Sequence, residues 1–246
     1  MHLESWQASS RRRRRSPQWM AAFTLCSVLE VGAGGFDEGM QAYERQDYAQ
    51  AMALLTPLAE AGQGDAEDIL GACYEEGQGD FVRAAQWYQK AASAGNADAM
   101  TRLAELYEDG DGLPQDTQQA LAWLEKAAAL HDIDAQTDLG ELWANVLGDN
   151  GKAAQWFSQA AEAGDAQAQY RLGLLLLGGD DVARDVARAW VYLSLAAHDI
   201  DDAAQSRDVL ELEMSPVELQ HARGLLADWQ KSHQLNAAPA SPSAPR

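Results

Sequence analysis

Small and apolar residues recur through the middle of the chain at the spacing of an amphipathic helix, and the helical segments come in pairs. Ala66, Leu70 and Tyr74 are each four residues apart, so they share one helical face. The stretch 77–80 contains two glycines and interrupts the pattern. The apolar face of the following segment then holds Ala84, Trp87, Tyr88, Ala91 and Ala92. This pattern predicts two helices joined by a short turn.

The same unit occurs four times. A large aromatic residue followed by an Ala-Ala step stands at Trp87, Trp123, Trp156 and Tyr192, which are 36, 33 and 36 residues apart. A leucine followed by a small residue precedes each of them, at Leu70-Gly71, Leu103-Ala104, Leu139-Gly140 and Leu172-Gly173. The distance from small residue to aromatic is 16, 19, 16 and 19, whereas the distance onward to the next small residue is always 17. The period predicts stacked helical hairpins, with the variation confined to the loop inside each hairpin.

Small residues have a predicted packing role in this array. Two helices approach to about 8 Å only where no bulky side chain separates them. We therefore expect Gly71 and Ala84 to set a close contact, and Trp87 to fill the volume between neighbouring hairpins. The predicted structural positions are Leu70, Gly71, Ala84, Trp87, Ala104, Ala120, Trp123, Gly140, Ala153, Trp156, Gly173, Ala189 and Tyr192.

Turn and cap residues mark the ends of several predicted helices. Gly95 and Gly164 follow second helices and suit the left-handed conformation that ends a helix. His131 stands at the equivalent position, but unlike glycine it has a side chain that disfavours the left-handed conformation. The turn there is therefore less well defined. In the longer loop 110–116, Asp116 is a predicted N-cap with Gln119 as its capping-box partner.

Further helices are predicted on both sides of the four units. Residues 36–62 form a divergent hairpin that keeps the register, because Leu54 stands 33 residues before Trp87. Residues 203–213 and 216–234 form a final pair, joined at Ser215-Pro216 with Glu218 as the capping-box acid. Its apolar side chains are expected to cover the last repeat: Leu219, Leu225, Leu226 and Trp229. The prediction is an all-α solenoid of about five hairpins over residues 36–200, with capping helices at 201–234.

These motifs resemble the Sel-one-like repeat (SLR) family, a relative of the tetratricopeptide repeats. The resemblance covers roughly residues 36–200, and the unit from Ala66 to Gly95 is similar to the family's repeat almost position for position. Trp143 and Leu176 depart from it, because they replace the equivalent of Tyr74. The resemblance implies a right-handed superhelix that serves as an adaptor in protein complexes. In bacteria such proteins are often exported and linked to the envelope or to host contact.

Charge is distributed unevenly along the chain. The net charge is −20, yet five of the eighteen basic residues form the run Arg11 to Arg15. Beyond Ala33 there remain 13 basic and 36 acidic residues, a balance of −23. Nucleic acids and anionic membranes are bound largely through lysine and arginine, so this composition argues against both partners.

The N-terminal 33 residues have the pattern of a secretory signal peptide. An uncharged stretch from Trp19 to Leu29 follows the arginine run, and a small residue, Ala33, stands at the expected cleavage position. Eleven residues are too few to span a bilayer as a helix. We expect a periplasmic or secreted protein, or a cytoplasmic one if the segment is a disordered basic extension with an apolar helix. A lipid anchor at Cys26 is disfavoured by the large Leu25 before it.

The C-terminal residues 235–246 contain three prolines and no apolar periodicity, which predicts a flexible tail.

Catalytic and metal-binding patterns are missing from the sequence. None of the five histidines has a second one three or four residues away, and no HExxH or Gly-x-Ser-x-Gly motif occurs. The acidic stretch 108–112 copies part of a calcium loop but lacks the acid at its twelfth position. We therefore expect no metal and no cofactor.

One enzymatic alternative comes from the family resemblance. Some cysteine-rich SLR proteins bind or hydrolyse β-lactams and carry a cysteine pair in each repeat. The repeat array of this chain holds Cys73 alone, which the pattern predicts as a buried side chain. The sequence therefore favours a non-catalytic protein, with a β-lactam enzyme as a remote alternative.

The first helix of each hairpin is expected to line the concave side of the array and to contact a protein or peptide partner. The predicted contact residues are Asp68, Glu75, Glu105, Glu108, Asp109, Glu141, Tyr170 and Leu174. This surface runs from acidic to apolar, so it suits a segment with a basic end and a hydrophobic end.

Two alternatives remain open for these residues. The charges can simply keep a helical surface hydrated while Leu174 and Leu177 pack against the cap. The same two leucines can instead mediate self-association in a structural subunit of the cell envelope. We expect a monomer.

Overall fold

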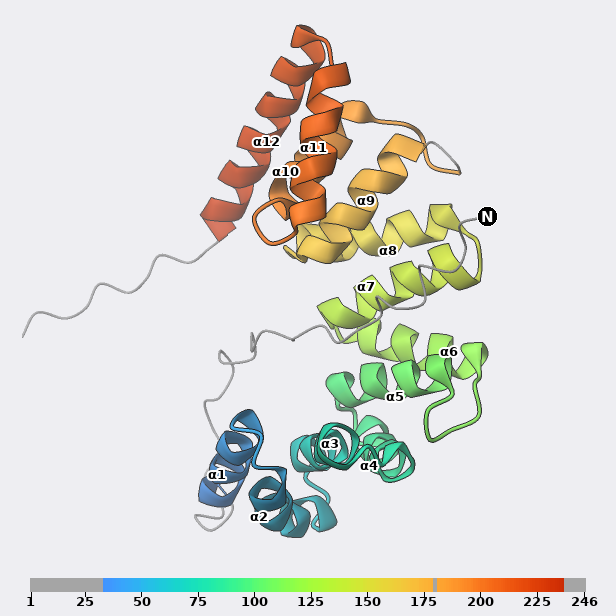
Figure 1. Ribbon diagram of the computed structural model, residues 1–246, viewed down its shortest axis with the longest axis vertical. Helices are drawn as coiled ribbons and strands as arrows, with labels where there is room; N and C mark the ends of the chain where they lie inside the picture. The colour runs from blue at the N-terminus through green and yellow to red at the C-terminus, as the bar shows by residue number, and fades with distance from the viewer. Residues whose placement is uncertain (1–32, 179–180, 237–246) are drawn as a thin grey trace, which may run out of the picture.

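A computed structural model describes residues 33–178 and 181–236, and every regular element in those residues is helical (Figure 1). The helices pair in chain order: α1 (Ala33–Glu44) with α2 (Tyr48–Glu60), α3 (Gly64–Ala72) with α4 (Phe81–Ser93), α5 (Ala97–Asp109) with α6 (Thr117–Ala129), α7 (Ile133–Glu141) with α8 (Asn150–Glu162), and α9 (Ala166–Gly178) with α10 (Val186–Ala196). Two further helices follow, α11 (Asp201–Glu213) and α12 (Pro216–Asn236). The predicted solenoid of five hairpins with a C-terminal helix pair is confirmed.

Some predictions fall on residues that the structure does not describe. The signal peptide, the arginine run and Cys26 lie outside the described residues, apart from Ala33, which begins α1. The tail lies outside them from residue 237 onward, while its first two residues belong to α12.

The stacked hairpins bend into a curved array. Figure 1 shows α1 at the lower left and α12 at the upper left of a column formed by the other helices. Among the described helices of the five hairpins, α1 contacts α3 and α7 contacts α9, whereas second helices make no comparable contact with each other. At these two places the first helices of neighbouring hairpins therefore lie against each other.

In three of the hairpins a close contact depends on a glycine in the first helix. A Cβ atom added at Gly71 would lie 2.6 Å from Cε1 of Tyr88, and one added at Gly173 would lie 2.9 Å from Cγ of Leu193. The equivalent addition at Gly140 would collide with the ring of Phe157. No side chain fits at these three positions without moving its neighbour.

Each residue facing a glycine directly follows one of the predicted aromatics. Tyr88 and Phe157 are 0% and 1% exposed, whereas Trp87 and Trp156 are only partly buried. Trp87 packs against a buried cluster that its own hairpin shares with the preceding one, as predicted for the volume between hairpins, and Nζ of Lys90 lies 3.6 Å from its ring centroid. Consecutive helical positions differ by 100°, and both fall within a broad apolar stripe. The sequence pattern therefore did not distinguish the ring that contacts the glycine from its neighbour.

Length variation between repeats lies inside the hairpins, as predicted. In the two shorter hairpins the first helix continues into a π-helical turn, η1 (Cys73–Gln78) or η2 (Leu142–Val146). The longer hairpin of α5 and α6 has an extended loop, in which Asp116 caps α6 by accepting from the backbone N–H of Gln118 and Gln119. The reciprocal half of that capping box is wrong, because the Asp116 N–H donates to the carbonyl oxygen of Tyr107 at 2.8 Å.

Turns between hairpins use the left-handed backbone conformation. Gly95 and Gly164 have φ angles of 97° and 98°, which confirms their predicted role. His131 takes the same conformation with φ 64°, although a side chain there is unfavourable.

The C-terminal helices cover the last hairpin through α10, against which both of them pack. The capping box before α12 is confirmed: the Ser215 N–H donates to Oε2 of Glu218 at 2.9 Å, and the Glu218 N–H donates to Oγ of Ser215 at 3.3 Å. Leu219, Leu225 and Leu226 pack against the buried residues of the last two hairpins. The predicted cover is therefore confirmed for these three leucines.

Candidate protein-interaction face

The predicted contact residues are carried by the first helices α3, α5, α7 and α9 and by the turn η1. Their exposure differs widely. Glu105 and Asp109 are exposed, whereas Asp68 is only 4% exposed. The half-buried members of the set are Glu75, Glu108, Glu141, Tyr170 and Leu174. We call the surface formed by Glu105, Glu108, Asp109 and Glu141 the acidic face.

Asp68 is a connection between repeats and not an outward contact position, so that part of the prediction is wrong. Its Oδ1 lies 3.7 Å from Nε of Arg102, which comes from the first helix of the next hairpin. The Arg102 guanidinium also lies 5.8 Å from the ring centroid of Tyr88. A buried charge needs a partner of opposite sign, and Arg102 supplies it.

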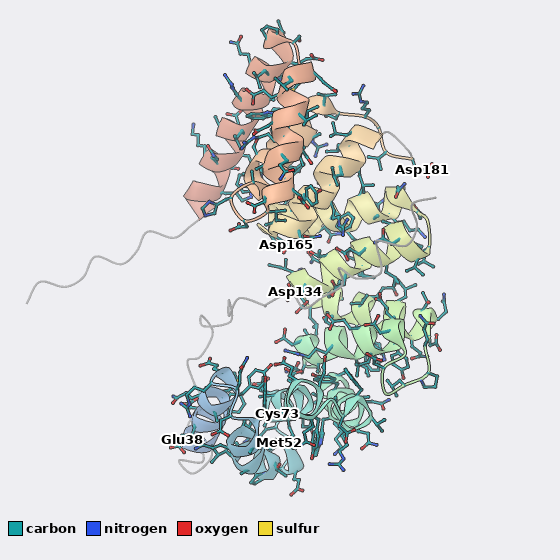
Figure 2. The ribbon with its side chains drawn as sticks, in the orientation of Figure 1. Glu38, Met52, Cys73, Asp134, Asp165 and Asp181 are labelled. Carbon is teal, nitrogen blue, oxygen red and sulfur yellow. The ribbon has the colours of Figure 1, made fainter. Side chains whose placement is uncertain are left out.

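The positions equivalent to Asp68 in the next two repeats also connect hairpins. Thr101 and Thr137 are fully buried. The hydroxyl of Thr137 donates to Oδ1 of Asp165 at 3.1 Å, and that same oxygen accepts the Ala168 N–H that begins α9. Figure 2 shows Asp165 along the same edge of the array as Asp134 at the start of α7. The N-terminal ends of successive first helices are thereby joined, since each cap also bonds to the preceding repeat.

Glu75 is held by a buried tyrosine. The hydroxyl of Tyr88 donates to Oε2 of Glu75 at 2.7 Å. Burial raises the pKa of Glu75, although this hydrogen bond and the charge of Arg102 oppose the shift. Glu75 therefore helps to position the ring of Tyr88, which packs against Gly71 of α3. The side chain of Glu75 is half-buried, so only part of it is accessible.

The acidic face combines residues of α5 with Glu141 of α7, whose charge acts on Glu108. Burial, followed by the neighbouring charges of Asp109, Glu105 and Glu141, raises the pKa of Glu108 to about 7. Arg171 of α9 lies 3.4 Å from Glu141 (Nε to Oε1) and neutralises part of that charge. This part of the first-helix surface is therefore anionic, with one carboxyl group that takes up a proton near neutral pH.

Glu108 makes the stability of the protein depend on pH. Its pKa is about 7 in the folded state and about 4.5 in the unfolded chain, so the folded state binds more protons between these values. The protonated Glu108 carboxyl group makes its full contribution to the free energy of unfolding below about pH 4.5, the unfolded pKa. This contribution is lost as the pH rises through about 7, the folded pKa. Glu108→Gln is expected to raise the melting temperature by about 2 to 4 °C at pH 8 and to change it little at pH 4.5. Calorimetry at the two pH values checks this, and an equal effect at both would contradict the assignment.

The apolar end of the predicted contact surface is partly used by the core. Tyr170, Leu174 and Leu177 are half-buried and pack against the buried residues of the last two hairpins. These side chains therefore offer less free surface than the sequence pattern suggests.

Cys73 is fully buried in the first part of the array, and Figure 2 shows it among the N-terminal helices. Burial, followed by the charge of Glu76, raises the pKa of its thiol to about 12. A thiol nucleophile needs the opposite shift, because the reactive species is the thiolate.

Metal and membrane sites were searched in the described part of the chain. Within residues 33–178 and 181–236, no three or more His, Cys, Asp or Glu side chains are placed to hold a metal ion together. None of the helices described there is both long and apolar enough to span a membrane.

Stacked helical hairpins joined through their first helices define the class of α-solenoid repeat proteins. The family model for the Sel1 repeat matches five consecutive segments, residues 36–63, 64–96, 97–132, 133–165 and 166–199. The chain belongs to the Sel1 repeat family. A search of curated proteins finds no match.

Solved structures show the same fold. A Sel1 repeat protein from Oxalobacter formigenes is 32% identical, with a TM-score of 0.61 over 69% of this chain and 72% of that one. A protective antigen present in uropathogenic Escherichia coli strains, which displays an SLR fold, is 25% identical with a TM-score of 0.66. The match covers 87% of this chain but only 58% of that antigen's chain. PilF from Pseudomonas aeruginosa is 16% identical with a TM-score of 0.58, so it is similar in fold alone.

Proposed function

We propose that this protein is a non-catalytic scaffold that binds a protein or peptide on the inner side of its solenoid. The acidic face supports the proposal, because Glu105 and Asp109 are exposed beside the half-buried Glu108 and Glu141. The partner is a segment with basic residues for the acidic face and apolar residues for the end near Leu174. Asp68 takes no part in the binding, since it is paired with Arg102.

Charge reversal on the acidic face tests this function. Glu105→Lys combined with Glu108→Lys is expected to weaken partner binding by tenfold or more, because like charges then face each other. The measurement is the affinity of the purified variant, by calorimetry, for a partner identified in a pull-down from the native host. The helical content is expected to remain unchanged.

A matched control carries the same charge change on second helices. Glu60 of α2 and Glu125 of α6 are both exposed, so Glu60→Lys with Glu125→Lys alters the net charge equally but leaves the acidic face intact. The control is expected to bind like the wild type. Equal loss of binding in both double variants would show that only net charge matters and would reject the inner side as the site.

Export is the second element of the proposal. The N-terminal pattern of a signal peptide supports a periplasmic or secreted location. Sequencing the N-terminus of the mature chain from the native host tests it. We expect a start close after Ala33, and an intact N-terminus would favour a cytoplasmic protein.

Self-association is the competing function, and one observation favours it. Three apolar side chains at the C-terminal end are strongly exposed: Val209 (60%), Leu212 (88%) and Val217 (77%). Leu174 and Leu177 are less accessible than these residues, so the cap is the better candidate for contact between copies. Light scattering at micromolar concentration separates the two functions, and we expect a monomer.

The remote enzymatic alternative rests on the family resemblance alone. The buried, protonated thiol of Cys73 opposes a nucleophilic role. We expect no turnover of a chromogenic β-lactam by the purified protein, and turnover that is lost in Cys73→Ser would reverse this assignment.

A further inference from the structure

Two tyrosine hydroxyl groups hold the carboxylate of Glu76 at the surface of the first two hairpins. The hydroxyl of Tyr43, near the end of α1, donates to Oε1 at 2.8 Å, and the hydroxyl of Tyr48, the first residue of α2, donates to Oε2 at 3.2 Å. Glu76 is exposed, whereas both tyrosines are half-buried. A surface glutamate usually loses rotamer freedom when it binds a partner, and here the tyrosines already restrict it.

The backbone around Glu76 is shaped to bring these three residues together. Glu76 lies in the π-helical turn η1, and a Cβ atom added at the next residue, Gly77, would lie 2.7 Å from Cγ of Tyr48. The backbone after Glu76 therefore runs directly against that ring. The rings of Tyr43 and Tyr48 meet edge to face, with centroids 6.0 Å apart and planes at 65°. The surface here combines a positioned carboxylate with two packed aromatic side chains.

The charge of Glu76 is not neutralised by the residues that the structure describes. No lysine or arginine of residues 33–178 and 181–236 forms an ion pair with it, and its hydrogen bonds are those from the two tyrosines. Arg102, whose charge acts on Tyr43, is paired with Asp68. A carboxylate has about four lone-pair sites, of which the tyrosine hydroxyls occupy two. The remaining sites can accept hydrogen bonds from a partner.

Both tyrosine hydroxyls have to remain donors for this arrangement to persist. Burial raises the pKa of Tyr43, and the charge of Glu76 acts in the same direction. The Tyr43 hydroxyl therefore keeps its proton at neutral pH and continues to donate to Glu76.

A guanidinium group fits the remaining sites better than an ammonium group. Its planar fork can donate two parallel N–H bonds to the two oxygens of one carboxylate, whereas an ammonium group acts as a point charge. A guanidinium also packs well against aromatic side chains. The chemistry around Glu76 therefore selects arginine over lysine.

Glu76 belongs to the same anionic surface as the acidic face. The charges of Glu105 and Glu76 both act on Glu75. A basic segment bound at Glu105 therefore also experiences the charge of Glu76.

We propose that Glu76, held by Tyr43 and Tyr48, is the anchor for an arginine side chain of the bound partner. The guanidinium donates two hydrogen bonds to the carboxylate, and the tyrosine hydroxyls keep the carboxylate oriented for them. This inference rests on the binding function proposed above, and it specifies an arginine in the basic end of the partner.

NMR titration of the full chain with N-acetylargininamide at low ionic strength tests the anchor without the partner. We expect the amide resonances of Tyr43, Tyr48 and η1 to shift, and we expect no such shifts with the neutral isostere N-acetylcitrullinamide. Glu76→Gln is expected to weaken the binding about tenfold, because the charge-assisted hydrogen bonds are lost. Tyr43→Phe keeps the ring but removes one positioning hydroxyl, and is expected to weaken the binding about threefold.

Glu44→Gln is the matched control. Glu44 is exposed and directly follows Tyr43, so the substitution removes the same charge from a neighbouring position. It is expected to bind N-acetylargininamide like the wild type. Unchanged binding in Glu76→Gln, or an equal loss in Glu44→Gln, would overturn the proposal.

Partner affinity separates this inference from the proposed function. Glu76→Gln is also expected to weaken partner binding about tenfold. If Glu105→Lys with Glu108→Lys abolishes partner binding while Glu76→Gln leaves it unchanged, the scaffold function stands and the anchor is wrong. If partner binding survives both sets of substitutions, the proposed function is wrong as well, and the titration then reports only an arginine site that the partner does not use.

Discussion

Replacing Gly71 with leucine is expected to lower the free energy of unfolding by about 3 kcal/mol, the upper part of the range for overpacking a core. A Cβ atom alone would lie 2.6 Å from the ring of Tyr88. That ring has little freedom to move away, because it is fully buried and its hydroxyl is bonded to Glu75. Urea unfolding followed by circular dichroism measures the change.

Gly224→Leu is the control for this substitution. Gly224 lies in the middle of α12, and an added Cβ would meet no atom within 4 Å. Because glycine is unfavourable inside a helix, the control is expected to stabilise the protein by up to about 1 kcal/mol. If both variants unfolded at the same urea concentration, the close contact between Gly71 and Tyr88 would not limit stability.

Phe157→Ala is expected to have the largest effect, a loss of about 3 to 5 kcal/mol. Phe157 is 1% exposed and its ring occupies the space that the absent side chain of Gly140 leaves free. The substitution leaves a cavity between α7 and α8, and the neighbouring helices cannot close it without giving up their other contacts.

Trp156→Ala, at the adjacent position, provides the comparison. Trp156 is only partly buried, so its loss removes fewer contacts and is expected to cost less than the loss of Phe157, despite its larger side chain. Both values come from the same denaturant titration. A larger loss of unfolding free energy in Trp156→Ala than in Phe157→Ala would show that the tryptophan contributes more to the packing.

The proposed binding face lies on helices that also connect the hairpins. Along the first helices, Asp68, Thr101 and Thr137 connect successive hairpins through an ion pair or N-cap hydrogen bonds. One turn further along α5, Glu105 is exposed. The residues that connect the hairpins and the exposed Glu105 of the proposed binding face therefore lie on different turns, and reversing the charge of Glu105 alone is expected to change binding with little effect on folding.

Periodicity in the sequence determined the solenoid, the boundaries of the five hairpins and the position of the length variation. These features are local, because they follow from residue spacing within about 36 positions. Cap residues such as Asp116 and Ser215 were found for the same reason, since a helix end is determined by its nearest neighbours in the chain.

Only the tertiary structure decided which members of an apolar stripe face the neighbouring helix and which charged side chains are paired inside the array. The choice of Tyr88 over Trp87 depends on the angle at which two helices cross, and that angle is set by all their side chains together. The burial of Asp68 depends on Arg102, 34 residues later, and the contact of His233 with Glu162 joins residues that are 71 positions apart. The last two contacts leave no period in the sequence, because each is made once, where the packing of the hairpins brings two distant side chains together.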